Sequence, residues 1–445
     1  MKDLTKGKPS RLILAFAIPI FMANILQLTY SIVDTRIVGS YLGENSLAAV
    51  GATTTLSNLM IGFLMGLANG FAIITAQKFG ARDYAGVKKS FALSIKMGCI
   101  IALTITVLCL LFLRQILGFL NVSNDLMGMA VSYIFIIIAG LVATFLYDAC
   151  AAALRALGDT VTPLVILAVS VCLNMAGDIF FVVVLKAGVA GAAIATVFSQ
   201  YVSGIGIWIY TWVRFPELRP EKRHMCWDRG ILKQITNLSL LTCVQQSIMN
   251  FGILMVQGLI NSFGTVVMAA FASAVKIDSF AYMPVQDFGN AFSTFVAQNY
   301  GAEKPERIRK GVKSAVLSAF VFCVIVSTLV CVFARPLMEL FIHPTETEII
   351  RVGVEYLRIE ASFYIGIGLL FLLYGFYRAM NRPGMSVVLT VISLGTRVAL
   401  AYLLSAIPWI GVTGIWVSVP IGWLLADLVG VFVYKKMRKS MFGKG

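Results

Sequence analysis

Residues 88–112 read KKSFALSIKMGCIIALTITVLCLLF, and from Met97 onward this stretch carries no charged side chain. About 20 predominantly apolar residues in a helix are enough to cross the hydrocarbon core of a bilayer. Similar apolar runs recur from one end of the chain to the other. Hydrophobic residues make up 59% of the 445 positions and charged residues 13%, whereas a soluble globular protein carries roughly 25% charged residues. The sequence therefore predicts a polytopic integral membrane protein.

The apolar runs predict an all-α protein with about twelve transmembrane helices. The polar residues between the runs define the ends of each helix to within a few residues. We expect helices at 12–38, 46–76, 88–112, 126–152, 162–185, 188–213, 231–262, 266–298, 310–334, 352–377, 384–406 and 412–434.

The net charge of +15 is distributed unevenly over the connections between these helices. Basic residues concentrate at alternate connections, while the remaining connections hold little beyond Arg114, Lys186, Arg335 and Arg351. Membrane proteins carry their excess of Lys and Arg on the cytoplasmic side. The distribution therefore predicts a multi-pass protein of the cytoplasmic (inner) membrane with both termini in the cytoplasm, and it excludes nucleic acid as the reason for the positive charge.

The sequence repeats itself at a separation of about 222 residues. The segment AQKFGARDYAGVKKS at 76–90 is echoed by AQNYGAEKPERIRKG at 297–311, and GVAGAAIATVFSQ at 188–200 by GVTGIWVSVPIGW at 411–423. Two six-helix halves that begin on the same side of the membrane form a parallel repeat, with a substrate cavity between them. We expect an N-terminal lobe at 1–213, a cytoplasmic linker at 214–230 and a C-terminal lobe with a basic tail at 231–445.

Several motifs occur in order along nearly the whole chain. Residues 19–35 read PIFMANILQLTYSIVDT, residues 154–163 LRALGDTVTP, residues 173–182 LNMAGDIFFV, and residues 288–302 FGNAFSTFVAQNYGA. Together they resemble the bacterial branch of the MATE family of multidrug and toxic-compound extrusion transporters. The resemblance implies two helical bundles around a V-shaped central cavity, and transport without enzymatic activity.

Ionisable and polar side chains inside the predicted helices are candidates for the coupling of transport to an ion, because such residues are costly in a membrane. Asn174 and Asp178 lie four residues apart and therefore share one face of a helix. The resemblance places a cation or proton site on Asp34, Asn174, Asp178 and Thr196. Carboxylate, amide and hydroxyl oxygens can replace the hydration shell of Na⁺, and shielding from water favours the protonated form of a carboxylic acid. The coupling ion is thus expected to be Na⁺ or H⁺, with no other cofactor.

Asp148 departs from the family pattern, which commonly has an amide near this position. We expect it to act as a third coupling carboxylate; the alternative is that it only forms a hydrogen bond to a neighbouring helix. Pro19 lies inside the first predicted helix, where a proline bends the backbone. Candidates for the substrate cavity are Asn24, Gln27, Gln200, Gln245, Asp287 and Asp427.

The second half does not repeat the coupling residues. At the repeat separation, the counterparts of Asp34 and Asp178 fall near Met255 and Ala401, and that of Asn174 falls near Arg397. The second half instead has other polar residues within its predicted helices, including Asp278 and Glu360. Ion coupling is therefore expected in the first half.

These features predict a secondary active antiporter, acting as a monomer, that exports cationic amphipathic compounds in exchange for inward Na⁺ or H⁺ as its two bundles rock. The chain contains no phosphate-binding GxxxxGK[ST] motif, which favours an ion gradient as the energy source. It contains no HExxH or GxSxG motif, which argues against an enzyme. The alternative is a flippase for lipid-linked precursors of the same broad superfamily, which would need a cavity suited to anionic head groups.

Overall fold

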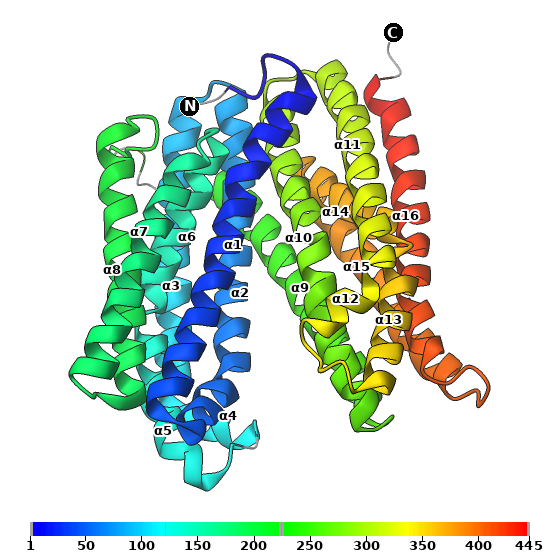
Figure 1. The fold of residues 1–445 in the computed structure, drawn as a ribbon. Helices are drawn as coiled ribbons and strands as arrows, with labels where there is room; N and C mark the ends of the chain where they lie inside the picture. The colour runs from blue at the N-terminus through cyan, green and yellow to red at the C-terminus, as the bar shows by residue number, and fades with distance from the viewer. Residues whose placement is uncertain (1–2, 121, 222–223, 225–226, 443–445) are drawn as a thin grey trace. The chain divides into compact units, whose positions relative to one another are not determined.

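The computed structural model describes residues 3–120, 122–221, 224 and 227–442. Figure 1 shows long helices joined by short connections, and these residues contain no β-strand. Part of the predicted linker, namely residues 222–223 and 225–226, lies outside the described residues.

In the first half of the chain, eight α-helices and one π-helical segment are described. They are α1 (Pro9–Leu42), α2 (Glu44–Gly80), α3 (Tyr84–Leu111), α4 (Leu113–Phe119), α5 (Asn124–Ala139), α6 (Leu141–Ala156), α7 (Val161–Asp178), η1 (Ile179–Val184) and α8 (Gly188–Arg214).

In the second half, eight further α-helices are described. They are α9 (Arg229–Asn261), α10 (Thr265–Gly301), α11 (Pro305–Val332), α12 (Ala334–Glu339), α13 (Thr347–Ala361), α14 (Tyr364–Ala379), α15 (Pro383–Ser405) and α16 (Thr413–Phe442).

The expectation of an all-α membrane protein with about twelve spans is confirmed. Within the described residues, ten helices are long and apolar enough to cross a membrane. Two further pairs pass the same test together but are bent, α5 with α6 by 42° and α13 with α14 by 52°. If each bent pair is one span, the total is twelve. The bends themselves have no counterpart in the predicted spans, which run straight through both breaks.

The helices form two compact units whose borders lie inside helices. Unit 1 contains Ile18–Cys243 with Met1–Asp3, and unit 2 contains Leu4–Ala17 and Val244–Gly445. These borders differ from those of the predicted lobes at 1–213 and 231–445, because α1 and α9 each contribute residues to both units.

Packing at the start of α9 explains why its first turns belong to unit 1. The Ser239 hydroxyl donates to the carbonyl of Leu67 (3.5 Å), and the Cys243 thiol donates to the carbonyl of Phe63 (3.4 Å). Ser239 reaches α2 at Gly70, where a Cβ atom would lie only 2.6 Å from the Ser239 hydroxyl oxygen. The close approach therefore depends on a glycine in α2.

The residues before α1 are held by unit 2. The amide N–H of Leu4 donates to Gln298 Oε1 (3.0 Å), and the Leu4 carbonyl accepts from Asn299 Nδ2 (3.2 Å) and Arg307 Nη2 (3.1 Å). Leu4 is fully buried. Pro19, the predicted bend, lies inside α1 just after the border between Ala17 and Ile18, and the helix continues through it.

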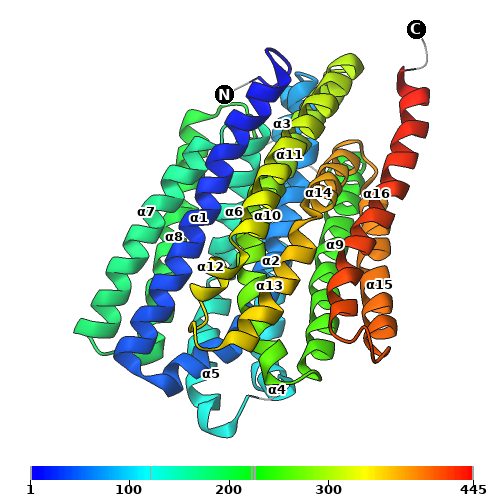
Figure 2. The same ribbon diagram turned by 45° about the vertical axis from the view of Figure 1, so that its right-hand side comes forward.

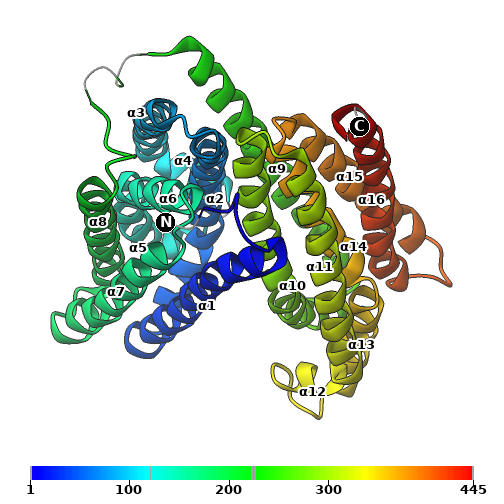
Figure 3. The same cartoon turned by 90° about the horizontal axis from the view of Figure 1, so that it is seen from above.

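In each unit the longest helix packs against several others. In unit 1, α2 packs against α3, α5 and α6, while α8 packs against α5, α6 and α7. In unit 2, α10 packs against α11, α13 and α14, and α15 runs beside α16, as Figures 2 and 3 both show. These arrangements position the polar side chains that lie inside the helices.

Candidate functional site

Three helices of unit 1 bring together the polar residues predicted for ion coupling. Asp34 comes from α1, Asn174 and Asp178 from α7, and Thr196 from α8. All four side chains are buried, and Asp178 has no exposed surface. The structure adds Tyr30, which precedes Asp34 by four residues and so lies on the same face of α1. The same spacing rule would have identified Tyr30 from the sequence.

The site is a chain of polar contacts with the two carboxyl groups at one end. The Tyr30 hydroxyl lies 3.2 Å from the Thr196 hydroxyl. The side-chain amide of Asn174 forms two hydrogen bonds. Its nitrogen donates to Asp178 Oδ2 (3.0 Å), and its oxygen accepts from the Thr196 hydroxyl (3.2 Å). The carboxyl groups of Asp34 and Asp178 lie within hydrogen-bonding range of one another. One network therefore joins α1, α7 and α8.

One oxygen of each carboxyl group lacks a hydrogen-bond partner among the described residues. The Oδ1 atoms of Asp34 and Asp178 are buried and accept no hydrogen bond from any described N–H or O–H group. A buried, unsatisfied oxygen is costly unless a proton or a cation occupies it. With Asn174 and Thr196 nearby, the donor set consists of hard oxygen atoms, the kind that hard cations bind.

An apolar layer closes the site on one side. Val38, Val182 and Ala192 form a buried cluster, with Tyr133 packed against it. Each of the three lies four residues from a site residue, namely Asp34, Asp178 and Thr196, so the layer is one helical turn away. The cluster therefore gives the site an apolar boundary on that side.

The backbone changes its winding directly after Asp178. Residues Ile179–Val184 form a π-helix that continues α7. Short π-helical segments occur frequently at functional sites. The sequence IFFVVV carries no signal for this geometry, and a regular helix was expected here.

Asp148 stands apart from this network. It lies on α6, and among the described residues the charged group recorded as acting on it is Arg155, near the end of the same helix. The described structure records no hydrogen bond or ion pair between Asp148 and any of the four predicted coupling residues. The structure thus brings together four of the five residues expected to couple transport to an ion.

The residues predicted for a substrate cavity are divided between the units. Asn24, Gln27 and Gln200 belong to unit 1, and Gln245, Asp287 and Asp427 belong to unit 2. Gln27 is exposed, whereas Gln245, Asp287 and Asp427 are buried. Gln200 faces Gly140, at the bend between α5 and α6.

Asp427 lies in the wall of an apolar pocket of about 680 Å³ between α14 and α16. Its Oδ1 atom is buried and has no hydrogen-bond partner among the described residues. Ser362 is the other polar residue of the lining, and the rest of the lining is apolar apart from Gly366. A single carboxyl group in an apolar pocket suits a ligand with a cationic group and an apolar body.

Unit 2 contains a second buried polar cluster that had no role assigned from the sequence. Asp278 on α10 accepts hydrogen bonds from the hydroxyl groups of Tyr364 and Tyr356 (3.5 Å for Tyr356). Glu360 on α13 lies within hydrogen-bonding range of Asp278. Arg397 on α15 is close enough to interact electrostatically with both carboxyl groups.

Known proteins resemble this chain over almost its whole length. The MatE family model matches residues 19–180 and 239–403. The probable multidrug resistance protein YpnP of Bacillus subtilis strain 168 is 26% identical, with 97% of this chain and 96% of that protein covered. The probable multidrug resistance protein NorM of Thermotoga maritima is 22% identical, with 94% and 89% covered.

Solved structures agree. A multidrug resistance MATE family transporter of the MOP superfamily, described in an outward-facing conformation, superposes with a TM-score of 0.91 at 25% identity, covering 100% of this chain and 99% of that one. Because the family model covers well over half of the chain, this protein belongs to the MatE family of multidrug transporters, whose members are transporters and not enzymes.

Proposed function

We propose that this protein is an antiporter that exports organic cations in exchange for inward H⁺ or Na⁺, with Asp34 and Asp178 as the coupling residues. The observation that carries the proposal is the buried pair of carboxyl groups in unit 1. The hydrogen bond from the Asn174 amide to Asp178, and the contact of that amide with the Thr196 hydroxyl, support the proposal.

The physical argument is one of charge balance. Two carboxylates in contact repel each other strongly when both are charged and shielded from water. Among the described residues, no Lys, Arg or His is recorded as acting on Asp34 or Asp178, and the charge recorded as acting on each carboxyl group is that of the other. The pair therefore needs a proton or a metal cation from outside to remain buried. A site that must be filled by a mobile ion can link the conformation of the protein to an ion gradient.

The apolar pocket at Asp427 supports organic cations as substrates. Its walls suit an apolar body, and its carboxylate attracts a positive group. A flippase for lipid-linked precursors would instead need positive charge along the path of an anionic head group. No Lys or Arg lines the Asp427 pocket in the described structure, which favours the exporter.

The proposal is tested by reconstituting the protein in liposomes and following ethidium efflux under an imposed pH or Na⁺ gradient. Asp34→Asn and Asp178→Asn should each abolish gradient-driven efflux, and the gradient that drives the wild type identifies the ion. Asp125→Asn, which changes an exposed aspartate at the start of α5, is the matched control and should leave efflux unchanged. Efflux that survives both substitutions in unit 1 would contradict the proposed site.

We also propose that both termini are cytoplasmic and that the protein acts as a monomer in the inner membrane. The alternation of basic and nearly uncharged connections supports this orientation. Alkaline phosphatase fused after Gly445 should be inactive in cells, while green fluorescent protein fused there should fluoresce. The reverse pattern would contradict the orientation.

A further inference from the structure

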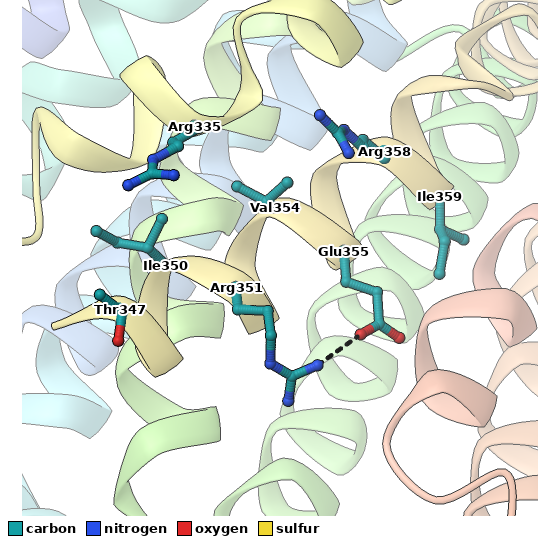
Figure 4. Close-up of a pocket in the computed structure, with 8 residues that line it drawn as sticks. All are labelled: Arg335, Thr347, Ile350, Arg351, Val354, Glu355, Arg358 and Ile359. Atoms are coloured by element: carbon teal, nitrogen blue, oxygen red, sulfur yellow. Dashed lines mark ion pairs between the residues drawn. The ribbon is translucent and has the colours of Figure 1, made fainter. Parts of the chain in front are cut away.

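A second pocket of about 570 Å³ lies at one end of unit 2 and is lined by arginines (Figure 4). It is formed by α12 and one face of α13. This is the end at which α11 finishes, opposite the end that holds the C-terminal residues of α16 (Figure 1). The lining consists of Arg335, Thr347, Ile350, Arg351, Val354, Glu355, Arg358 and Ile359.

The sequence of α13 explains why these side chains share one pocket. The seven lining residues of α13 follow each other at spacings of three or four, or as adjacent pairs, so they form one stripe along the helix. The other side of α13 carries Tyr356 and Glu360, which belong to the buried cluster around Asp278. The helix therefore presents buried polar groups on one side and a charged pocket on the other.

The pocket has more positive than negative charge. Three guanidinium groups line it, against the single carboxylate of Glu355. Glu355 already accepts a hydrogen bond from the Thr413 hydroxyl (2.5 Å) and lies 3.9 Å from Arg351.

The three arginines differ in how far they are neutralised. Arg351 pairs with Glu348 (2.6 Å), and Arg335 pairs with Glu339 (2.9 Å). Arg358 has no carboxylate partner in the described chain, and its Nε donates to the carbonyl of Cys331 (3.4 Å). Its remaining N–H groups are free to bind an anion.

The location makes this charge unusual for a membrane protein. By the distribution of charges in the sequence, this end belongs to the side with few basic residues. Of the four basic residues noted on that side, Arg335 and Arg351 both line this one pocket. Because Arg335 and Arg351 already have carboxylate partners, the charge in this pocket that lacks an anionic partner in the described structure is that of Arg358.

We propose that the pocket binds an anionic phospholipid, with the phosphate between Arg335, Arg351 and Arg358 and the first part of the hydrocarbon against Ile350, Val354 and Ile359. Guanidinium groups bind phosphate through paired, charge-assisted hydrogen bonds. The apolar residues in the same lining favour an amphiphile over a free inorganic ion. Ile359 also lines the apolar pocket between α14 and α16, so the hydrocarbon can continue onto an apolar surface.

The test measures binding of dioctanoyl phosphatidylglycerol, dioctanoyl phosphatidylcholine and inorganic phosphate to the full-length protein in dodecyl maltoside. Wild type should bind the phosphatidylglycerol at least about tenfold more tightly than the other two. The choline cation of phosphatidylcholine cancels the charge of its phosphate and is repelled by the arginines, and inorganic phosphate has no hydrocarbon to bury. Arg351→Gln with Arg358→Gln should remove this preference. Arg114→Gln, which changes an exposed arginine of α4 in unit 1, is the matched control and should retain it.

Arg358→Lys keeps the charge but loses the paired geometry, so it should weaken phosphatidylglycerol binding about threefold to tenfold in a protein that folds normally. Equal binding of the two lipids by wild type, or a preference that survives in the double variant, would overturn the proposal. Inorganic phosphate binding as tightly as phosphatidylglycerol would show a free-anion site instead.

A transport assay separates a resident lipid from a transported one. If liposomes containing the protein move labelled phosphatidylglycerol between leaflets, and the double variant does not, the pocket belongs to a lipid-transport path and the proposal of a resident lipid fails. Normal ethidium efflux by the double variant would show that the exporter proposal stands independently of this pocket.

Discussion

The two units each bury a pair of carboxyl groups, but they balance the charge in different ways. In unit 1, Asp34 and Asp178 are accompanied by an amide and hydroxyl groups, and no cationic side chain is recorded as acting on them. In unit 2, Asp278 and Glu360 have Arg397 nearby and two tyrosine hydroxyls donating to Asp278. The pair in unit 2 has a cationic side chain nearby, whereas the described structure records none for the pair in unit 1.

The repeat locates this difference at one position. Asn174 on α7 and Arg397 on α15 are 223 residues apart, the same separation as between Tyr133 and Tyr356. Asp34 and Asp178 are close enough to interact electrostatically with Tyr133, while Tyr356 donates to Asp278. An amide in one unit thus stands where a guanidinium stands in the other. The carboxyl groups themselves do not correspond in this way, because the repeat places the counterparts of Asp34 and Asp178 near Met255 and Ala401.

Asn174→Arg should have the largest effect, because it gives unit 1 the fixed cation of unit 2. A permanent positive charge beside Asp34 and Asp178 would take the place of the mobile ion, and gradient-driven ethidium efflux should fall by about 100-fold or more. Asn174→Gln keeps the amide and is the control. Its efflux should stay within about tenfold of wild type, because the longer side chain must repack in a buried site. Normal coupling in the Asn174→Arg protein would refute the proposed role of charge balance.

Arg397→Gln should affect stability more than coupling. Removing one partner from a buried charged cluster leaves the other charge uncompensated, which costs about 3 kcal/mol. The midpoint of thermal unfolding in detergent should therefore drop by several degrees, while the dependence of efflux on the driving ion stays the same. Adding Glu360→Gln to this variant should restore part of the stability, since one of the uncompensated carboxylates is then gone. An unchanged midpoint in the single variant would show that Arg397 does not balance the pair.

The sequence predicted the spans well because length and apolar composition are local properties. The sequence did not predict the features of a helix that depend on the helices packed against it. The bends at Gly140 and near Ser362, and the π-helix after Asp178, lie inside stretches for which the sequence predicts continuous helices. No residue pattern marks either bend as different from a straight helix.

In the candidate site, too, the sequence predicts which residues share a helix face but not which helices that face contacts. The spacing of Asn174 and Asp178 placed both on one face of a helix, and the structure turns that face towards Asp34 and Thr196. Asp148 satisfies the same criterion of a charged residue inside a span, yet α6 holds it away from the other residues. Asp148 lies on α6, which packs mainly against α2, α3 and α8, and such packing between helices is not encoded in the local sequence.

Asp427→Asn should have a smaller effect, on the organic cation and not on the driving ion. Loss of the one carboxylate in the α14–α16 pocket should raise the KM for ethidium about tenfold, the contribution of one charge-assisted contact. Ser362→Ala, in the same pocket lining, is the control and should change KM little. If Asp427→Asn changed the dependence of efflux on the driving ion but not the KM for ethidium, Asp427 would be a coupling residue and not a substrate-binding residue.

Tyr30→Phe and Tyr364→Phe compare the two clusters by removing one hydroxyl group from each. The Tyr30 hydroxyl contacts Thr196 (3.2 Å) and reaches the carboxyl pair only through the network, so its loss should cost about 1 kcal/mol and slow efflux about fivefold. The Tyr364 hydroxyl donates directly to Asp278, so its loss should lower the unfolding midpoint and leave the rate of efflux nearly unchanged. Measuring both quantities for both variants distinguishes a network that serves transport from one that serves stability. If Tyr364→Phe slowed efflux as much as Tyr30→Phe, the cluster of unit 2 would also take part in coupling. The two units would then not divide transport and stability between them.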